Sequence, residues 1–446
     1  MSAIDPQFAA DFTNRYADYL NPLPEVNSFR EYLKFVPTSD RSGAQYVYPV
    51  QAAISQGQTA DKSGTAFTIN AARPGVELQA ILDGTDLIMR ETFPYSAMLK
   101  ARNGVSLQGD AAAYWDPMDK VMYTVMRGME HYNELMLMYG CGTGSTMLCD
   151  IGVIAAVPVA PGTGPNYNSA TKPIVQLTAD SWAAGIWNNM GSGGTTGSGA
   201  LVDIYQSNGT TLRIADVVVD GVTDASQCRV QMYGSGAVAV TAGDRIVPKG
   251  WVSNSSAGVE GILKNTGTFA NISAGINPFW KARQQAVGGA LTSSNFISYC
   301  SKLMPNGGSG SLTAFINPVV FADIVAGTIN NTRWINGDSG GENRVKRQGA
   351  DVLQFMTATG VVTLKRHEYM KQGQCWVLMD DEAVRVGASD ITFRGANGNE
   401  GFFLELTNQA GSEIRAISQQ AALLTCPYHN LILTGITSAN FDTPSV

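Results

Sequence analysis

The sequence predicts an α+β fold in which one long helix accompanies many short strands. Three observations support this prediction: a continuous helical pattern at 117–139, a polar excursion between strand-like segments at 46–82, and short strand-like segments over most of the remaining chain. With 446 residues, the chain can form two or three domains, each with its own hydrophobic core.

The chain carries few charges for its size. Only 15% of its residues are charged, against about 25% in soluble domains, whereas the apolar fraction of 44% is ordinary. Because a monomer depends on surface charge to stay soluble, this shortage predicts that protein covers much of the surface. The net charge of -7 argues against nucleic-acid binding driven by overall charge.

The first 82 residues predict an arm followed by a long hairpin. Residues 1–45 show little apolar periodicity beyond a short helix at 8–20, and the segment 29–50 is strand-like. Residues 55–75 are polar and glycine-rich. An isolated two-stranded hairpin is marginally stable in water, so this one is expected to lie on a neighbouring molecule. Its strands are expected at 46–54, 66–71 and 76–82.

The spine helix, residues 117–139, is the clearest predicted element. Asp116 is expected to cap its N-terminus, Pro117 occupies the first helical position, and Gly140 is expected to end it in a left-handed conformation. One apolar stripe runs along the helix and predicts that it packs on a sheet. The stripe consists of Met118, Met122, Val125, Met129, Tyr132, Met136 and Tyr139.

The region after the spine helix predicts a small antiparallel β-unit and then mixed structure. Helices are expected at 179–190, 292–304 and 319–329, and the glycine-rich residues 191–199 form a flexible loop. Residues 437–446 have no apolar pattern, so neighbouring subunits are expected to order them. The expected strands are 200–206, 211–220, 228–233, 237–240 and 244–248 in the β-unit, and 312–318, 361–365, 374–379, 384–386, 391–394, 401–407, 412–424 and 426–436 beyond it.

No pattern in the sequence predicts catalysis, a cofactor or a metal site. His131, His367 and His429 are more than sixty residues apart, and the acidic run 380–382 is typical of a solvated turn. Six cysteines without CxxC spacing predict reduced, mostly buried thiols. A cluster of basic residues predicts an exposed loop, with contact to phosphates or an acidic neighbour as the alternative. These residues are Arg344, Lys346, Arg347, Lys365 and Arg366.

Nothing in the sequence indicates a membrane segment. The longest apolar stretch, residues 151–160, is interrupted by Pro158 and is far shorter than the ~20 residues of a spanning helix. The first residues, MSAIDPQFAADF, lack the basic and apolar regions of a secretory signal. We therefore expect no membrane partner.

Three segments resemble the major capsid proteins of tailed bacteriophages, which share the HK97-type fold. Residues 275–281, Gly-Ile-Asn-Pro-Phe-Trp-Lys, resemble an aromatic segment that many of these proteins carry before their last third. Residues 242–246 resemble the stretch that commonly precedes it, and residues 384–394 are similar to a late strand region. The order of parts agrees over nearly the whole chain.

The resemblance implies a division of the chain into the parts of that fold. Its E-loop lies across an adjacent subunit, and some members cross-link an E-loop lysine to a neighbour's asparagine, for which Lys62 lies in the right segment. The implied inter-subunit contacts are Gly57, Gln58, Lys62, Gly64 and Phe67. The implied parts are an N-terminal arm (1–45), the E-loop (46–82), the P-domain with the spine helix (83–164), an inserted antiparallel β-domain (165–270), the A-domain (271–400) and a return to the P-domain (401–446).

The resemblance also implies partners. The protein would assemble with itself into pentamers and hexamers of an icosahedral shell, formed in the host cytoplasm and found in the virion. A portal would occupy one vertex, and a cement or decoration protein is a further candidate partner. A separate scaffolding protein is expected because no scaffolding helix precedes residue 1. Packaged double-stranded DNA would meet the acidic shell through weak, non-specific contacts.

Two other functions are alternatives at this point. An encapsulin-like compartment shares the fold but encloses enzymes, and its chains are generally shorter and lack the β-insertion. A β-rich adhesin or carbohydrate-active protein would need a cleft with paired carboxylates and usually a secretion signal, and the sequence lacks the signal.

Overall fold

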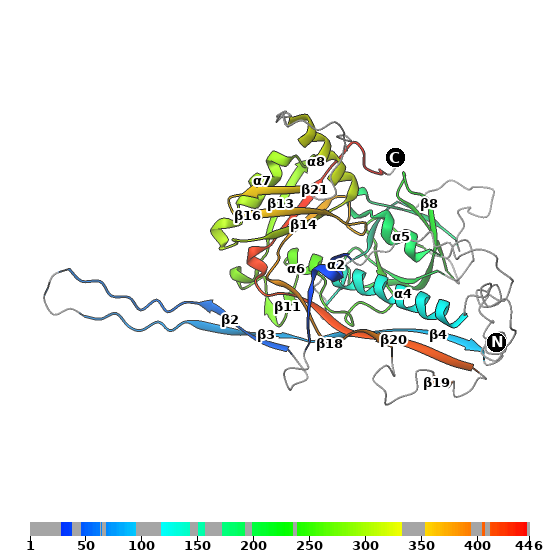
Figure 1. Cartoon of the computed structure of the whole chain (residues 1–446), viewed down its shortest axis with the longest axis horizontal. Coiled ribbons are helices and arrows are strands. Elements are labelled where there is room, and N and C mark those ends of the chain that lie inside the picture. The colour runs from blue at the N-terminus through cyan, green and yellow to red at the C-terminus, as the bar shows by residue number, and fades with distance from the viewer. Residues whose placement is uncertain are drawn as a thin grey trace, which may run out of the picture.

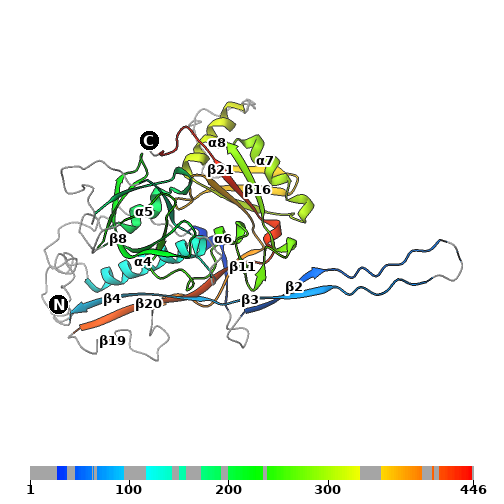
Figure 2. The same ribbon diagram turned by 180° about the vertical axis from the view of Figure 1, so that it is seen from behind.

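The structure is a computed structural model. It describes residues 28–37, 46–62, 64, 68–94, 117–142, 150–156, 172–191, 199–234, 239–331, 353–393, 404–405 and 411–443. These residues form two larger sheets, a closed barrel and a long hairpin (Figures 1 and 2). Within these ranges, no helix is both long and apolar enough to cross a lipid bilayer.

A five-stranded sheet, here called the long sheet, runs along one side of the molecule (Figure 1). Its strands are β1 (Lys34–Pro37), β4 (Thr85–Pro94), β18 (Ala383–Phe393), β19 (Leu404–Glu405) and β20 (Gly411–Leu424). The central strand β20 pairs antiparallel with β18 and β4, and it also pairs with β19. β1 joins the sheet in parallel to β18.

The spine helix α4 (Pro117–Tyr139) has the predicted bounds and packs on the long sheet. Along its first half, the buried residues Val121, Val125 and Met129 cluster with Ile414 and Ala416 of β20. Its second half has no exposed face, because every residue from 133 to 140 is buried. The one-sided stripe therefore describes only the first half, and the rest of the chain encloses the second half.

A six-stranded sheet forms the second layer of the fold. In spatial order its strands are β13 (Arg283–Gly289), β21 (Leu431–Ile436), β17 (Gln374–Met379), β14 (Leu312–Ile316), β16 (Gly360–Arg366) and β15 (Leu353–Thr357). Every residue of β14 and β17 is buried, as expected for central strands that are covered on both faces. The helices α7 (Ser293–Ser301) and α8 (Pro318–Asn331) pack against this sheet.

The predicted β-unit is a closed barrel of six strands. In order around the barrel they are β10 (Arg245–Pro248), β5 (Gly152–Ala156), β6 (Ile174–Leu177), β9 (Arg229–Tyr233), β8 (Leu212–Asp224) and β7 (Leu201–Tyr205). Closure leaves no unpaired sheet edge. Helix α5 (Ala184–Met190) packs on the barrel. Its Trp187 lies against Gly152 of β5, where a Cβ on the glycine would come within 2.8 Å of the indole.

The remaining elements connect these bodies. The hairpin consists of β2 (Tyr46–Ala53) and β3 (Val76–Leu82), which pair with each other. The short elements are α2 (Ser28–Tyr32), η2 (Ala179–Ser181), α6 (Val259–Leu263), β11 (Thr268–Phe269), β12 (Ile272–Ser273), η3 (Pro278–Trp280), η4 (Met304–Asn306) and η5 (Pro427–His429). Two predicted segments contribute to both sheets. Strand β18, from the segment 271–400, belongs to the long sheet, and β21, from the segment 401–446, belongs to the six-stranded sheet.

Several local predictions differ from the structure. Helix α2 (Ser28–Tyr32) occupies the start of the segment 29–50 that was predicted as strand-like. The predicted helix 179–190 is interrupted at Trp182, whose backbone is extended and whose indole N–H donates to Asp442. Residues 68–71 and 239–240 are not in strands. The other residues of 66–71 and 237–240, and the predicted helix 8–20, lie outside the described residues.

The end of the spine helix differs from the prediction in its mechanism. Gly140 follows the last helical residue, but its φ lies outside the left-handed region. A glycine is needed there because another segment passes very close: a Cβ on Gly140 would lie 2.3 Å from the backbone oxygen of Ser256. Close packing, and not a left-handed turn, therefore explains this glycine.

Residues 437–443, here called the C-terminal strap, are held by their own chain. The N–H of Thr437 donates to the carbonyl of Gly289 beside the six-stranded sheet. At the other end, the carboxylate of Asp442 accepts the indole N–H of Trp182 at 3.0 Å, next to the barrel. These intramolecular contacts order the described part of the segment that neighbouring subunits were expected to order.

Candidate assembly interface

The hairpin of β2 and β3 projects far beyond the body of the molecule (Figures 1 and 2). β2 and β3 form a ladder near the body, and the described residues beyond it are extended but not assigned as strands. A few hydrogen bonds hold these outer arms together. The N–H of Gln56 donates to the carbonyl of Arg73 at 3.0 Å, and the amide of Asn70 donates to the carbonyl of Gln58 at 2.9 Å.

Glycines allow the two arms of the hairpin to run close together. A Cβ on Gly75 would lie 2.7 Å from the carbonyl oxygen of Ala53, and one on Gly57 would lie 3.2 Å from the Cα of Ala72. Gly64, between the two arms, has a φ of +70°, which side-chain-bearing residues rarely adopt. The glycine-rich composition thus gives a narrow hairpin.

Exposed apolar side chains follow the hairpin from its base outward. Val47 and Val76 are 42% and 50% exposed, and Ile54 and Ile69 are 66% and 75% exposed. Single exposed aliphatic residues are normal on a protein surface. Four of them lie on one two-stranded element that has no core of its own, which makes the hairpin the candidate contact surface of the molecule.

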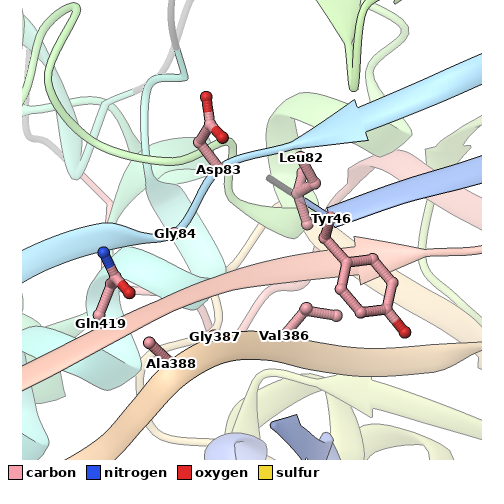
Figure 3. Close-up of a pocket in the computed structure, with 8 residues that line it drawn as sticks. All are labelled: Tyr46, Leu82, Asp83, Gly84, Val386, Gly387, Ala388 and Gln419. Atoms are coloured by element: carbon pink, nitrogen blue, oxygen red, sulfur yellow. The ribbon is translucent and has the colours of Figure 1, made fainter. Parts of the chain in front are cut away.

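The base of the hairpin is fixed to the body. Tyr46 and Leu82 are buried, and the N–H of Ile81 donates to the carbonyl of Ala270 at 3.0 Å. A cavity of about 220 Å³ lies where the hairpin meets β18 and β20 of the long sheet (Figure 3). It is lined by Tyr46, Leu82, Asp83, Gly84, Val386, Gly387, Ala388 and Gln419.

Glu134 of the spine helix ties the N-terminal segment to the body. Its carboxylate accepts the backbone N–H groups of Phe29 and Arg30 at 2.8 and 2.7 Å. It also contacts the Nε2 atom of His367 at 2.8 Å, and the Nδ1 atom of that ring accepts the N–H of Tyr369 at 3.2 Å. These contacts place the proton of a neutral His367 on Nε2. These contacts anchor helix α2, at the C-terminal end of the predicted arm, in the protein interior.

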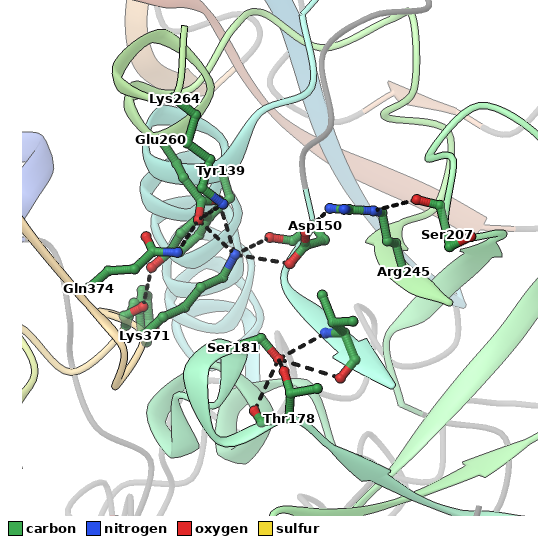
Figure 4. Close-up of polar contacts among 12 residues, drawn as sticks. Tyr139, Asp150, Thr178, Ser181, Ser207, Arg245, Glu260, Lys264, Lys371 and Gln374 are labelled. Carbon is green, nitrogen blue, oxygen red and sulfur yellow. Dashed lines mark hydrogen bonds and ion pairs between the residues drawn. The ribbon is translucent and has the colours of Figure 1, made fainter. Parts of the chain in front are cut away.

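A second interior network joins the spine helix, the barrel and the six-stranded sheet (Figure 4). The buried ammonium of Lys371 contacts Asp150 at 3.0 Å and Glu260 at 2.9 Å, and it lies 4.6 Å from the ring centroid of Tyr139. Arg245 of the barrel contacts the other oxygen of Asp150 at 2.7 Å. Burial by itself would lower the pKa of Lys371, but attraction to Asp150 and Glu260 outweighs it and raises this pKa.

Tyr369 is the centre of a further buried contact with the spine helix. Its hydroxyl lies 2.6 Å from the Nδ1 atom of His131 and accepts the side-chain amide of Asn189 at 2.7 Å. Burial lowers the pKa of His131 from 6.5 to about 4, so this imidazole is neutral at pH 7.

The structure places most of the predicted contact residues on the projecting hairpin. Gln58, Lys62 and Gly64 are exposed and Gly57 is half-buried, while Phe67 lies outside the described residues. The sequence analysis did not select Ile54 and Ile69, although isolated isoleucines in a polar segment could have marked them. Contact of any of these residues with another subunit stays a prediction.

The thiol prediction is confirmed for the described cysteines. Cys141, Cys228, Cys300 and Cys375 are free and buried, and Cys426 is free and half-buried. Burial raises the pKa of Cys228 and Cys300 to about 12, which makes both thiols inert at neutral pH.

Comparison with solved structures decides the fold. Over 96% of its length, the chain superimposes on 97% of a chain from the Cyanophage A-1(L) capsid asymmetric unit, with a TM-score of 0.52 and 10% sequence identity. The chain has a phage capsid fold. This likeness confirms the predicted capsid-type fold with mixed α and β structure.

Weaker likenesses accompany this one. The alignment with a chain from the capsid of the native GTA particle covers 96% of this chain and 96% of the other, with a TM-score of 0.43 and 7% identity. For the capsid of Myoviridae phage XM1 the TM-score is 0.44 and the identity 4%, over 96% of this chain and 98% of the other. No family model matches the sequence, and no curated protein matches it.

Proposed function

We propose that this chain is the major capsid protein of a tailed bacteriophage, with a structural and not an enzymatic role. It would assemble as pentamers and hexamers into an icosahedral shell around double-stranded DNA. The observation that carries the proposal is the long hairpin with exposed apolar residues, in a chain that has a phage capsid fold over nearly its whole length.

The physical argument concerns what the hairpin can gain. In water, a two-stranded hairpin without a core is marginal. Laid across a sister subunit, it would cover Ile54 and Ile69 and add backbone contacts that a compact body does not offer. Repeating head-to-tail contacts of this kind close into rings, and large obligate interfaces agree with the low charge content of 15%.

The parts of the chain receive roles on the same basis. Residues 1–45 would be the arm along the shell and 46–82 the E-loop, with Gly57, Gln58, Lys62, Gly64 and Phe67 at its contacts. The P-domain would comprise 83–164 and 401–446, and the A-domain 271–400, with 165–270 as an inserted domain. A scaffolding protein during assembly, a portal at one vertex and a decoration protein would be its partners.

Removing the hairpin tests the proposal. Because Ala53 pairs with Val76, an Asn-Gly turn can replace residues 54–75 and close the ladder. This variant is expected to keep the circular dichroism spectrum and unfolding midpoint of the wild type, but to form no rings or shells in electron micrographs. Shells that form equally well without the hairpin would overturn the proposal.

A second variant separates the length of the hairpin from its apolar contacts. The double substitution Ile54→Ser and Ile69→Ser keeps the hairpin but removes its two most exposed apolar side chains. It is expected to assemble only at higher protein concentration than the wild type, as measured by light scattering.

If shells form but enclose an enzyme and not a genome, the encapsulin alternative replaces the phage proposal.

A further inference from the structure

Three metal-ligating side chains meet where the chain crosses between the long sheet and the six-stranded sheet. Glu382 lies in the turn between β17 and β18, Cys426 precedes η5, and His429 is its last residue. One potential ligand atom from each lies within 4.8 Å of the others. We propose that this trio, here called the crossover cluster, binds one divalent transition-metal ion, with Zn²⁺ as the ion that fits it best.

The chemistry of the donor set favours zinc. Thiolate, imidazole and carboxylate are the side chains that bind Zn²⁺ in proteins, and a thiolate disfavours Mg²⁺ and Ca²⁺. Cys426 and His429 are separated by two residues, the spacing of many paired zinc ligands. Three protein ligands leave the fourth tetrahedral position for water or for a group from another molecule.

A second observation is independent of the spacing. The Oε1 atom of Glu382 contacts the Nδ1 atom of His429 at 2.6 Å, but its Oε2 atom is shielded from solvent and has no hydrogen-bond partner among the described residues. An unpaired, solvent-shielded carboxylate oxygen is unfavourable. A cation beside it would supply the missing contact.

Other residues fix the backbone that carries the ligands. Asn430 is fully buried, accepts the N–H of Met379 at 2.9 Å and donates to the carbonyl of Cys426 at 2.8 Å. The N–H of Thr425 donates to the carbonyl of Glu382 at 3.1 Å. The turn between β17 and β18 and the segment after β20 are thus hydrogen-bonded to each other before any ion binds. This is the preorganisation that a metal site needs.

Binding changes the protons of the cluster. The ion replaces the hydrogen bond between Glu382 and His429, and it takes a lone pair from a ring nitrogen of His429. The thiol of Cys426 loses its proton to solvent as the sulfur–metal bond forms. Binding therefore releases the thiol proton, and the affinity rises as the pH increases.

Cobalt titration of the purified full-length chain tests the proposal, because Co²⁺ reports its own ligands. The wild type is expected to show a thiolate-to-cobalt charge-transfer band that saturates at one ion per chain and disappears when Zn²⁺ is added. Cys426→Ser is expected to abolish the band, and His429→Gln to weaken the affinity about tenfold or more. The matched thiol control, Cys228→Ser, is expected to keep the wild-type titration.

Thermal unfolding separates loss of the site from loss of the fold. Without metal, Cys426→Ser and Glu382→Gln are expected to unfold near the wild-type midpoint, and added Zn²⁺ to raise the midpoint of the wild type alone. A wild type without a band at millimolar cobalt, or a band that persists in Cys426→Ser, overturns the proposal. The measurement needs no shell, so its outcome is independent of the capsid proposal.

Discussion

Lys371 is a cation with almost no access to solvent, and its side chain is only 1% exposed. Its two carboxylate partners, Asp150 and Glu260, are equally buried, and a buried ion pair is stable only while it is complete. We expect Lys371→Met to lower the free energy of unfolding by about 3–5 kcal/mol, because two buried carboxylates lose their shared cation. Urea unfolding measures this loss.

Lys264 is the matched control for that substitution. It contacts the same carboxylate, Glu260, at 2.8 Å, but its side chain is 28% exposed. Because its ammonium is less buried than that of Lys371, Lys264→Met is expected to cost less than Lys371→Met. Equal losses for the two lysines would contradict the view that the buried network stabilises the junction.

His131 predicts a specific loss of stability in mild acid. Its pKa is about 4 in the folded chain, against 6.5 when unfolded. The unfolded chain therefore takes up the proton first, and the free energy of unfolding falls as the pH drops from 6.5 to 4, by about 3 kcal/mol in total. Above pH 6.5 this contribution is constant. His131→Gln is expected to flatten the pH profile over this interval, and an unchanged slope would count against a buried neutral imidazole.

Such single-residue features were not accessible from the sequence. Lys371, Asp150 and Glu260 come from three distant segments, and their meeting depends on the complete fold. His131 lies off the apolar stripe of the spine helix. It is buried because Tyr369, 238 residues further along the chain, packs against its ring, a property of the fold and not of the helix pattern.

Among the elements, the end of the spine helix has little room for a side chain. A Cβ on Gly140 would lie 2.3 Å from a backbone oxygen, and neither backbone can move freely there. Gly140→Ala is therefore expected to lower the free energy of unfolding by about 1–3 kcal/mol or more. Gly289→Ala is the control, because a Cβ at Gly289 has nothing within 4 Å, and thermal unfolding compares the two.

Elements with local signals were predictable. The spine helix begins at Pro117 as predicted, while its expected cap, Asp116, lies outside the described residues. Helix α7 begins beside Thr292, whose hydroxyl accepts the N–H of Asn295. The prediction of one helix over 179–190 was wrong, because tertiary contacts of Trp182 override the helical pattern there. The barrel was predicted as a β-unit, but its closure depends on β5 and β6, which lie outside the strands predicted for that unit.

On the scale of the whole molecule, the C-terminal strap joins the barrel to the six-stranded sheet through Asp442. Asp442→Ala would leave the indole N–H of the buried Trp182 without its acceptor, at an expected cost of about 1–3 kcal/mol. Asp442→Asn retains an acceptor oxygen and should recover most of this loss. Chemical denaturation of the two variants measures the difference, and equal destabilisation would argue against the hydrogen bond.

The pairing of distant strands also lay beyond the sequence pattern. β1 runs parallel to β18 although some 350 residues separate them, with Lys34 beside Val384. The periodicity of a segment predicts that it is a strand, but it does not predict which other strand it pairs with. The capsid resemblance therefore predicted the fold class, while the register and strand order required the three-dimensional structure.

The place of β21 in its sheet has a consequence for biosynthesis. This strand lies between β13 and β17, inside the sheet, although about 140 residues of chain separate it from β13. During synthesis β13 is therefore made long before the strand that pairs with it, and its edge stays open until β21 follows. An open strand edge favours aggregation, so this layer is expected to need protection in the nascent chain until β21 has been made.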